Sequence, residues 1–457
     1  MEVLEDVDYL VVGAGAMGMA FVDALTGAAD VSVAIVDRRH GAGGHLLDAY
    51  GFVRLHQASA FYGVASTLLG GGRVQAEGPE RGLHERASAA EVSEYYARVL
   101  ARLTGTGRVV FHGRSEYLGD QRFQSLLSGI RYRAPRARVV DARYLSPDIP
   151  ALTAPPFAVD DGARVVPVND LVRIRQAPDR FVIVGAGKTA TDTCVWLLQN
   201  GVAPNAITWV RPRDPWLLNR AVVQPDPAVF LGMAADTMVA VASSTSADDA
   251  FLRMEEAGIM LRLDPTVTPT MAKTPTLAMW ELELARMIDD VVRRGHLRAV
   301  APGRLVFADG DVRIPADALV VHCAAEGLKY PGLRPIWTTE AITPQPVRVG
   351  FPCFGAALAG YVEATRDDDA EKNRVCLPSP YANTTSDWAS MQVIGGDASL
   401  AMSQQADMRA WSNKTTLNPA RIPTDRAEDP AVLAATARLK ENIGAGRARL
   451  AEFAGRV

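Results

Sequence analysis

The pattern of apolar residues predicts two copies of a strand–turn–helix–strand unit. In the first copy, the apolar run Tyr9–Val12 predicts a strand, a helix continues to about Leu25, and residues 31–36 predict the next strand. In the second copy, Phe181–Val184 and residues 206–210 are the predicted strands, with a helix to about Asn200 between them. Strands that alternate with helices are typical of an α/β fold with parallel sheets.

The turn of the first copy has the sequence Gly13-Ala14-Gly15-Ala16-Met17-Gly18. Gly13 allows a tight turn, Gly15 lets backbone N–H groups approach a pyrophosphate, and Gly18 lets the helix lie close to the strand. The second strand ends on Asp37, which can accept hydrogen bonds from ribose hydroxyls. This combination of turn, helix and terminal acid predicts a dinucleotide site.

The turn of the second copy differs from the first in two ways. It reads Gly185-Ala186-Gly187-Lys188-Thr189-Ala190, so alanine replaces the third glycine. Arg211 and Arg213 follow its second strand, where the first copy has an acid. Because arginine pairs with a 2′-phosphate that a carboxylate would repel, the second site is predicted to prefer NADPH to NADH. An ATP-binding P-loop is excluded, since Val182 stands where that loop needs a glycine.

The segments around these copies predict further elements. Apolar spacing predicts a helix through Val92 and Leu103, then short strands over 108–144 and a proline-rich crossing over 147–167. After the second copy we expect an irregular segment over 216–276, a helix over 279–294 and a strand over 318–323. A last helix is expected over Pro430–Phe453.

Length, charge and cysteine content narrow the functional classes. A chain of 457 residues is long enough for two or three domains. Its net charge of −4 gives no reason to expect nucleic acid or a membrane as a partner, and no signal peptide or membrane span is evident, so we expect a cytoplasmic protein. The four cysteines are isolated in sequence, which argues against disulfides, a zinc site and a redox dithiol.

The two motifs and the segment after Asp37 resemble the class B flavin-dependent monooxygenases, which are two-dinucleotide-binding flavoproteins. The matching residues after Asp37 are Gly43-Gly44, Tyr50 and Arg54, while His45 and Leu46 differ from the usual Thr-Trp and His56 stands near a family aspartate. The sequence motif that is characteristic of this family, which precedes the second strand–turn–helix–strand unit, is absent. The resemblance implies two Rossmann-like domains, with the NADPH domain inserted into the FAD domain. The expected boundaries are 1–175 for the first part of the FAD domain, 176–325 for the NADPH domain with a helical insertion, and 326–457 for the second part of the FAD domain and the C-terminal helices.

We therefore expect an FAD- and NADPH-dependent monooxygenase that uses molecular oxygen on a small molecule through a flavin hydroperoxide. Another NADPH-dependent flavoenzyme (an oxidase, a dehydrogenase or a halogenase) and a non-catalytic redox sensor remain open. The candidate catalytic residues are Arg54, His56 and Asp48, with Arg54 as the cation expected beside the flavin. The candidate cofactor-binding residues are Gly13, Gly15, Gly18, Asp37, Arg38, Gly44, His45, Gln57, Gly185, Gly187, Lys188, Thr189, Arg211 and Arg213. No metal site is expected, and the substrate and oligomeric state do not follow from the sequence.

Overall fold

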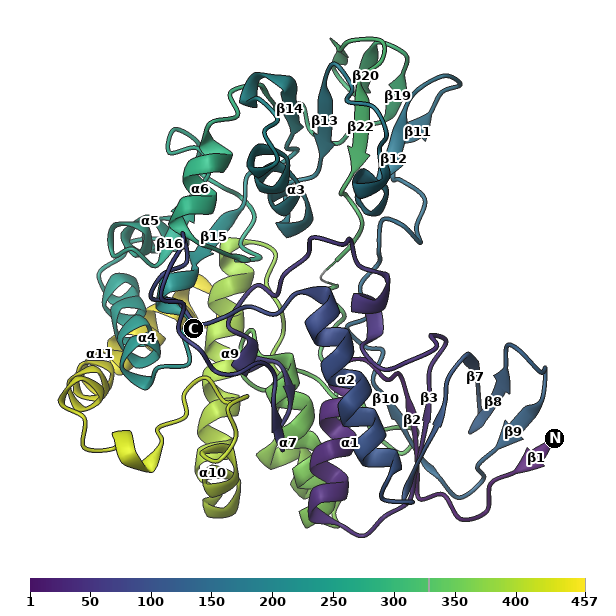
Figure 1. Ribbon diagram of the computed structural model, residues 1–457. Helices are drawn as coiled ribbons and strands as arrows, with labels where there is room; N and C mark the ends of the chain where they lie inside the picture. Colours follow the sequence, from purple (N-terminus) through teal and green to yellow (C-terminus); the bar gives the residue numbers. More distant parts are fainter. Residues whose placement is uncertain (328, 457) are drawn as a thin grey trace.

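The computed structural model describes residues 1–327 and 329–456, and it contains two parallel sheets (Figure 1). The sheet of the first unit has the order β10-β2-β3-β6 (Arg138–Asp141, Tyr9–Val12, Val33–Val36, Val109–His112), and all neighbours run parallel. Helices α1 (Ala16–Ala28) and α2 (Ala89–Thr104) belong to this unit. The sheet of the second unit, at the top of Figure 1, has the order β12-β22-β13-β14-β18 (Val165–Pro167, Leu319–His322, Phe181–Val184, Ile207–Val210, Val291–Val292).

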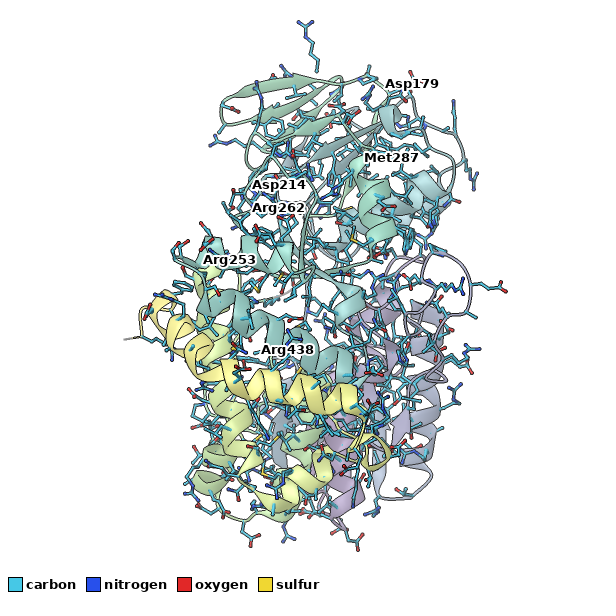
Figure 2. All side chains as sticks on the ribbon, turned by 90° about the vertical axis from the view of Figure 1, so that its left-hand side faces the viewer. Asp179, Asp214, Arg253, Arg262, Met287 and Arg438 are labelled. Carbon is cyan, nitrogen blue, oxygen red and sulfur yellow. The ribbon has the colours of Figure 1, made fainter. Side chains whose placement is uncertain are left out.

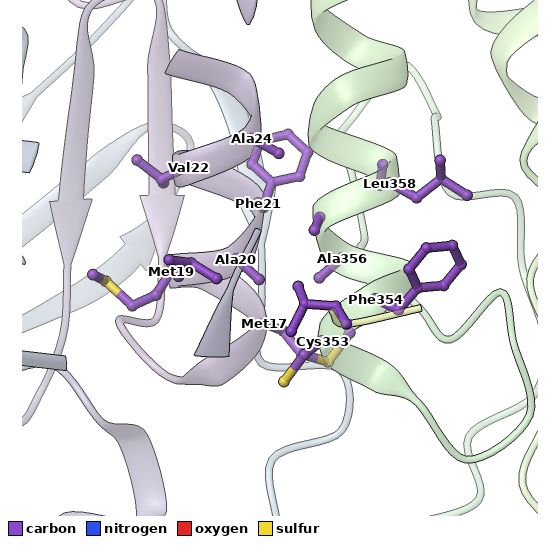
Figure 3. Close-up of a cluster of buried hydrophobic side chains, with 14 of the residues drawn as sticks. Met17, Met19, Ala20, Phe21, Val22, Ala24, Cys353, Phe354, Ala356 and Leu358 are labelled. Carbon is purple, nitrogen blue, oxygen red and sulfur yellow. The ribbon is translucent and has the colours of Figure 1, made fainter. Parts of the chain in front are cut away.

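The chain returns to the first unit after the second is complete. Ile342 makes a parallel bridge to Val140 of β10, and helix α7 (Pro352–Thr365) packs along α1. Figure 3 shows Met17 of α1 beside Cys353 of α7, and Gly360 further along lies against the carbonyl of Phe21. The two helices therefore run parallel, with their N-termini at the same end. This arrangement confirms the predicted α/β fold with the second unit inserted into the first.

Smaller sheets and a helical layer complete the molecule. One mixed sheet has the order β1-β9-β8-β7 (Glu2–Val3, Arg131–Arg133, Arg122–Ser125, Ser115–Gly119), and another has β11-β19-β20-β21 (Ala158–Val159, Ala299–Ala301, Arg304–Phe307, Gly310–Arg313). Strands β16-β15-β17 (Met260–Arg262, Trp216–Asn219, Thr276–Leu277) form a third, and β4 and β5 (Gly63–Val64, Thr67–Leu68) pair with each other. The remaining helices are α3 (Lys188–Gln199), α4 (Pro227–Ala242), α5 (Ala247–Glu256), α6 (Met279–Arg286), α8 (Asp369–Val375), α9 (Thr385–Ser403), α10 (Ala406–Ser412) and α11 (Pro430–Phe453).

The helical insertion of the second unit packs on the C-terminal helices. Helix α4 lies along α11, and Arg438 of α11, labelled in Figure 2, pairs with Asp236 of α4. Helix α5 contacts α9 through Phe251 and Trp388, whose ring centroids are 5.1 Å apart. These contacts join the insertion to the part of the chain that completes the first unit. None of the helices in the described residues is both long and apolar enough to cross a membrane.

Three expectations for individual segments need correction. Segment 216–276 is not irregular, since it contains α4 and α5; α4 is apolar on several faces and therefore lacks the amphipathic period that marks a surface helix. The helix expected over 279–294 ends at Arg286, because the following backbone joins the edge of the second sheet as β18. Strands β11 and β12 precede residue 176 but pair with strands of the second unit, so that unit begins earlier in the chain than expected.

Candidate functional site

The first glycine motif has the geometry of a phosphate-binding turn. Helix α1 begins directly after Gly15, which caps it without a side-chain hydrogen bond, so backbone N–H groups at the start of the helix are left for a ligand. A Cβ on Gly18 would lie 1.9 Å from the Gly13 carbonyl oxygen, which requires glycine there. Asp37 accepts hydrogen bonds from the Ala14 and Arg39 backbone N–H groups, both at 2.7 Å. The acid is thereby fixed beside the motif, and a carboxylate retains further lone pairs for ribose hydroxyls.

The paired glycines pack directly on this motif. Gly44 has a φ of +60°, and a Cβ there would lie 2.8 Å from the Cα of Gly15. The Gly43 N–H donates to the Ala14 carbonyl at 2.9 Å. His45 follows; its side chain remains exposed, yet desolvation by the surrounding protein and then the charge of Arg39 lower its pKa to about 4. The segment that contains Gly43 and Gly44, which we expect beside the flavin, therefore packs against the first glycine motif.

The second motif faces this same segment. A Cβ on Gly185 would crowd the backbone of Cys323, whereas a Cβ on Gly187 would meet only open space at the start of α3. Lys188, the first residue of α3, pairs with Asp192, which also accepts a 2.7 Å hydrogen bond from the Tyr50 hydroxyl. Thr189 lies beside the same hydroxyl. Tyr50 of the first unit and Lys188 of the second thus meet at one carboxylate.

Four buried charged side chains join the two units, and we name Glu80, Arg86, Arg220 and Glu281 the charge cluster. Each is 7% exposed or less. Arg220 donates to Glu80 at 2.8 Å and to Glu281 at 2.6 Å, and Arg86 pairs with both carboxylates. Glu80 and Arg86 belong to the first unit, while Arg220 follows β15 and Glu281 lies in the first turn of α6. The two positive and two negative charges balance within the cluster.

The charge cluster positions His56. The carbonyl of His56 accepts a 2.9 Å hydrogen bond from Arg220 Nε and another from the Thr276 hydroxyl. Its imidazole Nδ1 is buried and has no hydrogen-bond partner among the described residues. Burial, followed by the charges of Lys188, Arg220 and Arg86, lowers the pKa of His56 well below its usual value. The imidazole is therefore neutral at physiological pH and keeps hydrogen-bonding capacity for a ligand. The neighbouring Gln57 contacts the Tyr62 hydroxyl through its backbone.

The other candidate catalytic residues make contacts of their own with protein groups. Arg54 is exposed, and its Nη1 donates to the Arg86 carbonyl at 3.0 Å. Asp48 pairs with Arg39. Arg38, expected to bind cofactor, is an exposed side chain that faces Glu116 at 3.8 Å. Sequence reasoning placed these residues by proximity along the chain, which does not determine side-chain direction.

Arg211 also differs from its expected role as the phosphate partner. It is 4% exposed, stacks on Trp209 at 4.8 Å, and pairs with Asp214 at 3.2 Å. Asp214, labelled in Figure 2, is also bound by Arg293 at 2.7 Å. Burial lowers the pKa of Arg211, although Asp214 acts against this. Its Nε atom has no hydrogen-bond partner among the described residues, but the side chain is almost completely buried, so it presents little surface to a phosphate.

Two further cations of this unit, Arg213 and Lys273, lie near each other, and the sequence analysis identified only Arg213. Arg213 has only the Asn383 amide, at 3.4 Å, and the Met271 sulfur as side-chain partners among the described residues. Lys273 lies 4.4 Å from the centroid of the Tyr330 ring, and burial followed by the charge of Arg213 lowers the pKa of Lys273. Arg213 was an expected site residue, but no motif pointed to Lys273. This pair provides positive charge with less carboxylate neutralisation than Arg211 has.

The described residues contain no cluster of histidine, cysteine, aspartate or glutamate that could hold a metal ion. All four cysteines are buried and free. The ionisable side chains that this site brings together are Tyr50, His56, Lys188, Asp192 and the charge cluster.

Comparison with known proteins gives relatives in both sequence and fold. No family model matches the chain. Uncharacterized proteins of Mycobacterium tuberculosis (strain H37Rv) and Mycobacterium bovis are each 40% identical over 419 residues, which is 90% of this chain and 78% of theirs. Among solved structures, the polycyclic ketone monooxygenase from Thermothelomyces thermophila aligns with a TM-score of 0.51 at 14% identity, covering 99% of this chain and 88% of that one. The chain therefore belongs to one family with these mycobacterial proteins, and it has the two-dinucleotide-binding fold of the flavin monooxygenases.

Proposed function

We propose that this protein is an FAD- and NADPH-dependent monooxygenase that acts on a small organic molecule with molecular oxygen. The observation that carries the proposal is the meeting of Tyr50 and Lys188 at Asp192. This contact brings the start of α3, where the second nucleotide would bind, against the segment that follows the first glycine motif. Two nucleotides bound in this way would face each other across His56.

The residues of the first unit suit FAD. The N-terminus of α1 offers backbone donors and partial positive charge to the pyrophosphate, and Asp37 is fixed where it can accept from a ribose. Gly13, Gly15, Gly18 and Gly44 keep this turn free of side chains. A bound flavin would supply the electron-transfer and oxygen chemistry that protein side chains lack. The protein would orient the ring and exclude water.

The residues of the second unit suit NADPH. Open space at Gly187 leaves room for a pyrophosphate at the start of α3, where Lys188 adds a cation. We assign recognition of the 2′-phosphate to Arg213 together with Lys273, because Arg211 is occupied by Asp214. Two cations with no carboxylate within salt-bridge distance in the described part of the chain would favour the extra phosphate.

His56 is the side chain to which we assign a direct part in the reaction. A neutral imidazole donates from one nitrogen and accepts at the other, so it can hold a proton at the place where the two cofactors meet. The Arg220 and Thr276 contacts to its carbonyl keep the residue in position. Arg54 and Asp48 have no part in this assignment, since one is exposed and the other is paired with Arg39.

The proposal is tested with the purified protein. We expect a yellow protein that releases FAD on denaturation and is bleached by NADPH without oxygen. In air, a panel of cyclic ketones is the first set of substrates, since the solved relative is a polycyclic ketone monooxygenase. Oxygen uptake that depends on substrate and exceeds peroxide release supports a monooxygenase. Stoichiometric peroxide with every compound would instead identify an oxidase, and a colourless protein that cannot take up FAD would refute the proposal.

A further inference from the structure

The turn that joins β8 to β9 presents apolar side chains to solvent. Leu127 is 78% exposed, and Leu126 and Ile130 are 45% and 40% exposed. The turn is ordered, because the Gly129 N–H donates to the Ser125 carbonyl at 3.0 Å and the Ser125 N–H donates to the Ile130 carbonyl at 2.9 Å. Single exposed apolar residues are common on protein surfaces, but three of them held outward at one turn indicate a contact surface.

Three arginines lie beside this turn. The Leu126 N–H donates to the carbonyl of Arg114 at 2.7 Å, which places Arg114 next to the turn. Arg131 begins β9 and Arg133 ends it, so both lie on the face of the strand opposite Tyr132, which packs on the core. All three arginines are exposed, and none has a carboxylate within salt-bridge distance among the described residues. We name Arg114, Leu126, Leu127, Ile130, Arg131 and Arg133 the β8–β9 tip.

Two carboxylates of the same sheet face other arginines. Glu116 of β7 lies 3.8 Å from Arg38, and Asp120, in the turn between β7 and β8, pairs with Arg122 at 2.9 Å. The β8–β9 tip therefore carries a local excess of positive charge. The net charge of −4, which gave no reason to expect a membrane partner, is a sum over the whole chain and does not describe this surface.

The β8–β9 tip lies away from the proposed cofactor site. In Figure 1, strands β7, β8 and β9 form the right-hand edge of the molecule, while the second unit is at the top and helices α4 and α11 are on the left. The exposure of Leu127 shows that no described segment of the chain covers it. The tip can therefore contact a partner without closing the site between the two units.

We propose that the β8–β9 tip binds the surface of a lipid bilayer that contains anionic lipids. The aliphatic side chains enter the boundary of the acyl chains, and the arginines pair with the anionic head groups above it. Lipids rearrange around a hairpin turn, whereas a protein partner would need a groove of matching shape. Nucleic acid is disfavoured, because the tip has no aromatic side chain on which bases could stack. This contact is separate from the proposed monooxygenase reaction.

The test is co-sedimentation of the full chain with vesicles of phosphatidylcholine, with and without phosphatidylglycerol as the anionic lipid. The wild-type protein is expected to bind the anionic vesicles and to be released by added salt, which screens the arginines. Leu127→Asp is expected to weaken this binding roughly tenfold or more, because it removes one inserted aliphatic side chain and adds a negative charge. Arg131→Gln is expected to weaken it about fivefold, the effect of one cation near an anionic surface.

Two variants elsewhere on the surface are matched controls. Leu152→Asp changes another exposed leucine, and Arg313→Gln removes an exposed arginine of β21. Both are expected to bind the anionic vesicles as the wild-type protein does. All four substitutions are at exposed positions, so each variant is expected to keep the wild-type melting temperature and flavin content.

The outcomes decide this inference independently of the flavin chemistry. Wild-type protein that does not sediment with anionic vesicles overturns it, as does binding that Leu127→Asp and Leu152→Asp weaken equally. Concentration-dependent dimers that Leu127→Asp abolishes, measured by analytical ultracentrifugation without lipid, would identify the tip as an interface between two copies and also overturn it. Should Leu127→Asp not fold, Leu127→Ser takes its place with the same expected direction.

Discussion

The glycines of the two motifs have different roles at the level of single residues. Gly18 is required by packing, because any Cβ there meets the Gly13 carbonyl oxygen. Gly15 has an ordinary φ of −77°, and its added Cβ would be in normal contact with Gly44 at 3.5 Å. Gly187 has open space around it. The fold itself therefore leaves room for a side chain at the last two glycines, and the proposed function explains them as space for a ligand.

This difference gives a matched prediction. Gly15→Val and Gly187→Val should fold, but the first should lose FAD and the second should bind FAD and respond poorly to NADPH, because each valine would occupy the place of a pyrophosphate. Flavin absorbance and anaerobic reduction rates measure the two effects. Gly18→Ala serves as the contrast and is expected to lower the melting temperature. A yellow Gly15→Val protein would show that the first motif does not bind FAD.

The lowered pKa of His56 predicts a pH dependence of stability. In the unfolded chain histidine titrates near about 6.5, whereas folded His56 stays neutral to lower pH. Below about pH 6.5 the unfolded state therefore binds more protons, and this residue's contribution to stability is lost as the pH falls toward the folded pKa, by at most about 1.4 kcal/mol per pH unit. His56→Gln should lose less stability than wild type between pH 7.5 and 5, as measured by urea unfolding. Equal losses would show that His56 is accessible to protons in the folded state.

At the level of elements, the charge cluster ties segments of both units through side chains rather than through a shared sheet. Glu80 and Arg86 come from the loop region before α2, Arg220 follows β15, and Glu281 lies at the start of α6. Because the members are buried, each charge depends on the others for compensation. Loss of one arginine leaves two carboxylates with a single cation.

We therefore expect Arg220→Met to destabilise the protein by about 3–5 kcal/mol. Arg98→Met is the matched control, because Arg98 pairs with Glu94 on the exposed face of α2 and is expected to contribute about 0.5 kcal/mol or less. Chemical unfolding of both variants measures the difference. If the two variants were equally stable, the cluster would not hold the units together.

At the level of the whole molecule, the two cations to which we assign recognition of the 2′-phosphate come from distant parts of the chain. Arg213 follows β14, Lys273 precedes β17, and Asn383 precedes α9, yet Arg213 reaches Asn383 and the charges of Arg213 and Lys273 interact. Arg211 pairs instead with the buried Asp214, which the more exposed Arg293 also binds. The fold thus separates two arginines that are neighbours in sequence into different environments.

Arg213→Ala and Lys273→Ala are each expected to raise the KM for NADPH by roughly tenfold or more, because each removes one charge-assisted contact to phosphate, which contributes about 1.5–3 kcal/mol. The KM for NADH is expected to change little. Arg211→Ala should lower the melting temperature while leaving the NADPH to NADH ratio near the wild-type value. Steady-state kinetics with both nucleotides distinguish the assignments. Loss of discrimination in Arg211→Ala alone would restore the expectation drawn from the sequence.

The sequence by itself determined the two strand–turn–helix–strand units and the last helix. Strands Tyr9–Val12 and Phe181–Val184 and helix Pro430–Phe453 have the predicted bounds, because apolar periodicity and glycine turns act over short stretches of chain. The sequence pattern did not predict helix α4. Because α4 packs against α11, it needs no polar face toward that helix and lacks a clear amphipathic period.

Only the tertiary structure decided which charged side chains share a site. Arg54 and His56 are two residues apart, yet the Arg54 side chain is exposed while the Nδ1 atom of His56 is buried. Arg220, Glu281 and Lys273 belong to no sequence motif, because their roles depend on contacts between segments far apart in the chain. Local sequence fixes backbone conformation over a few residues, whereas burial and charge pairing depend on which distant residues the fold brings together.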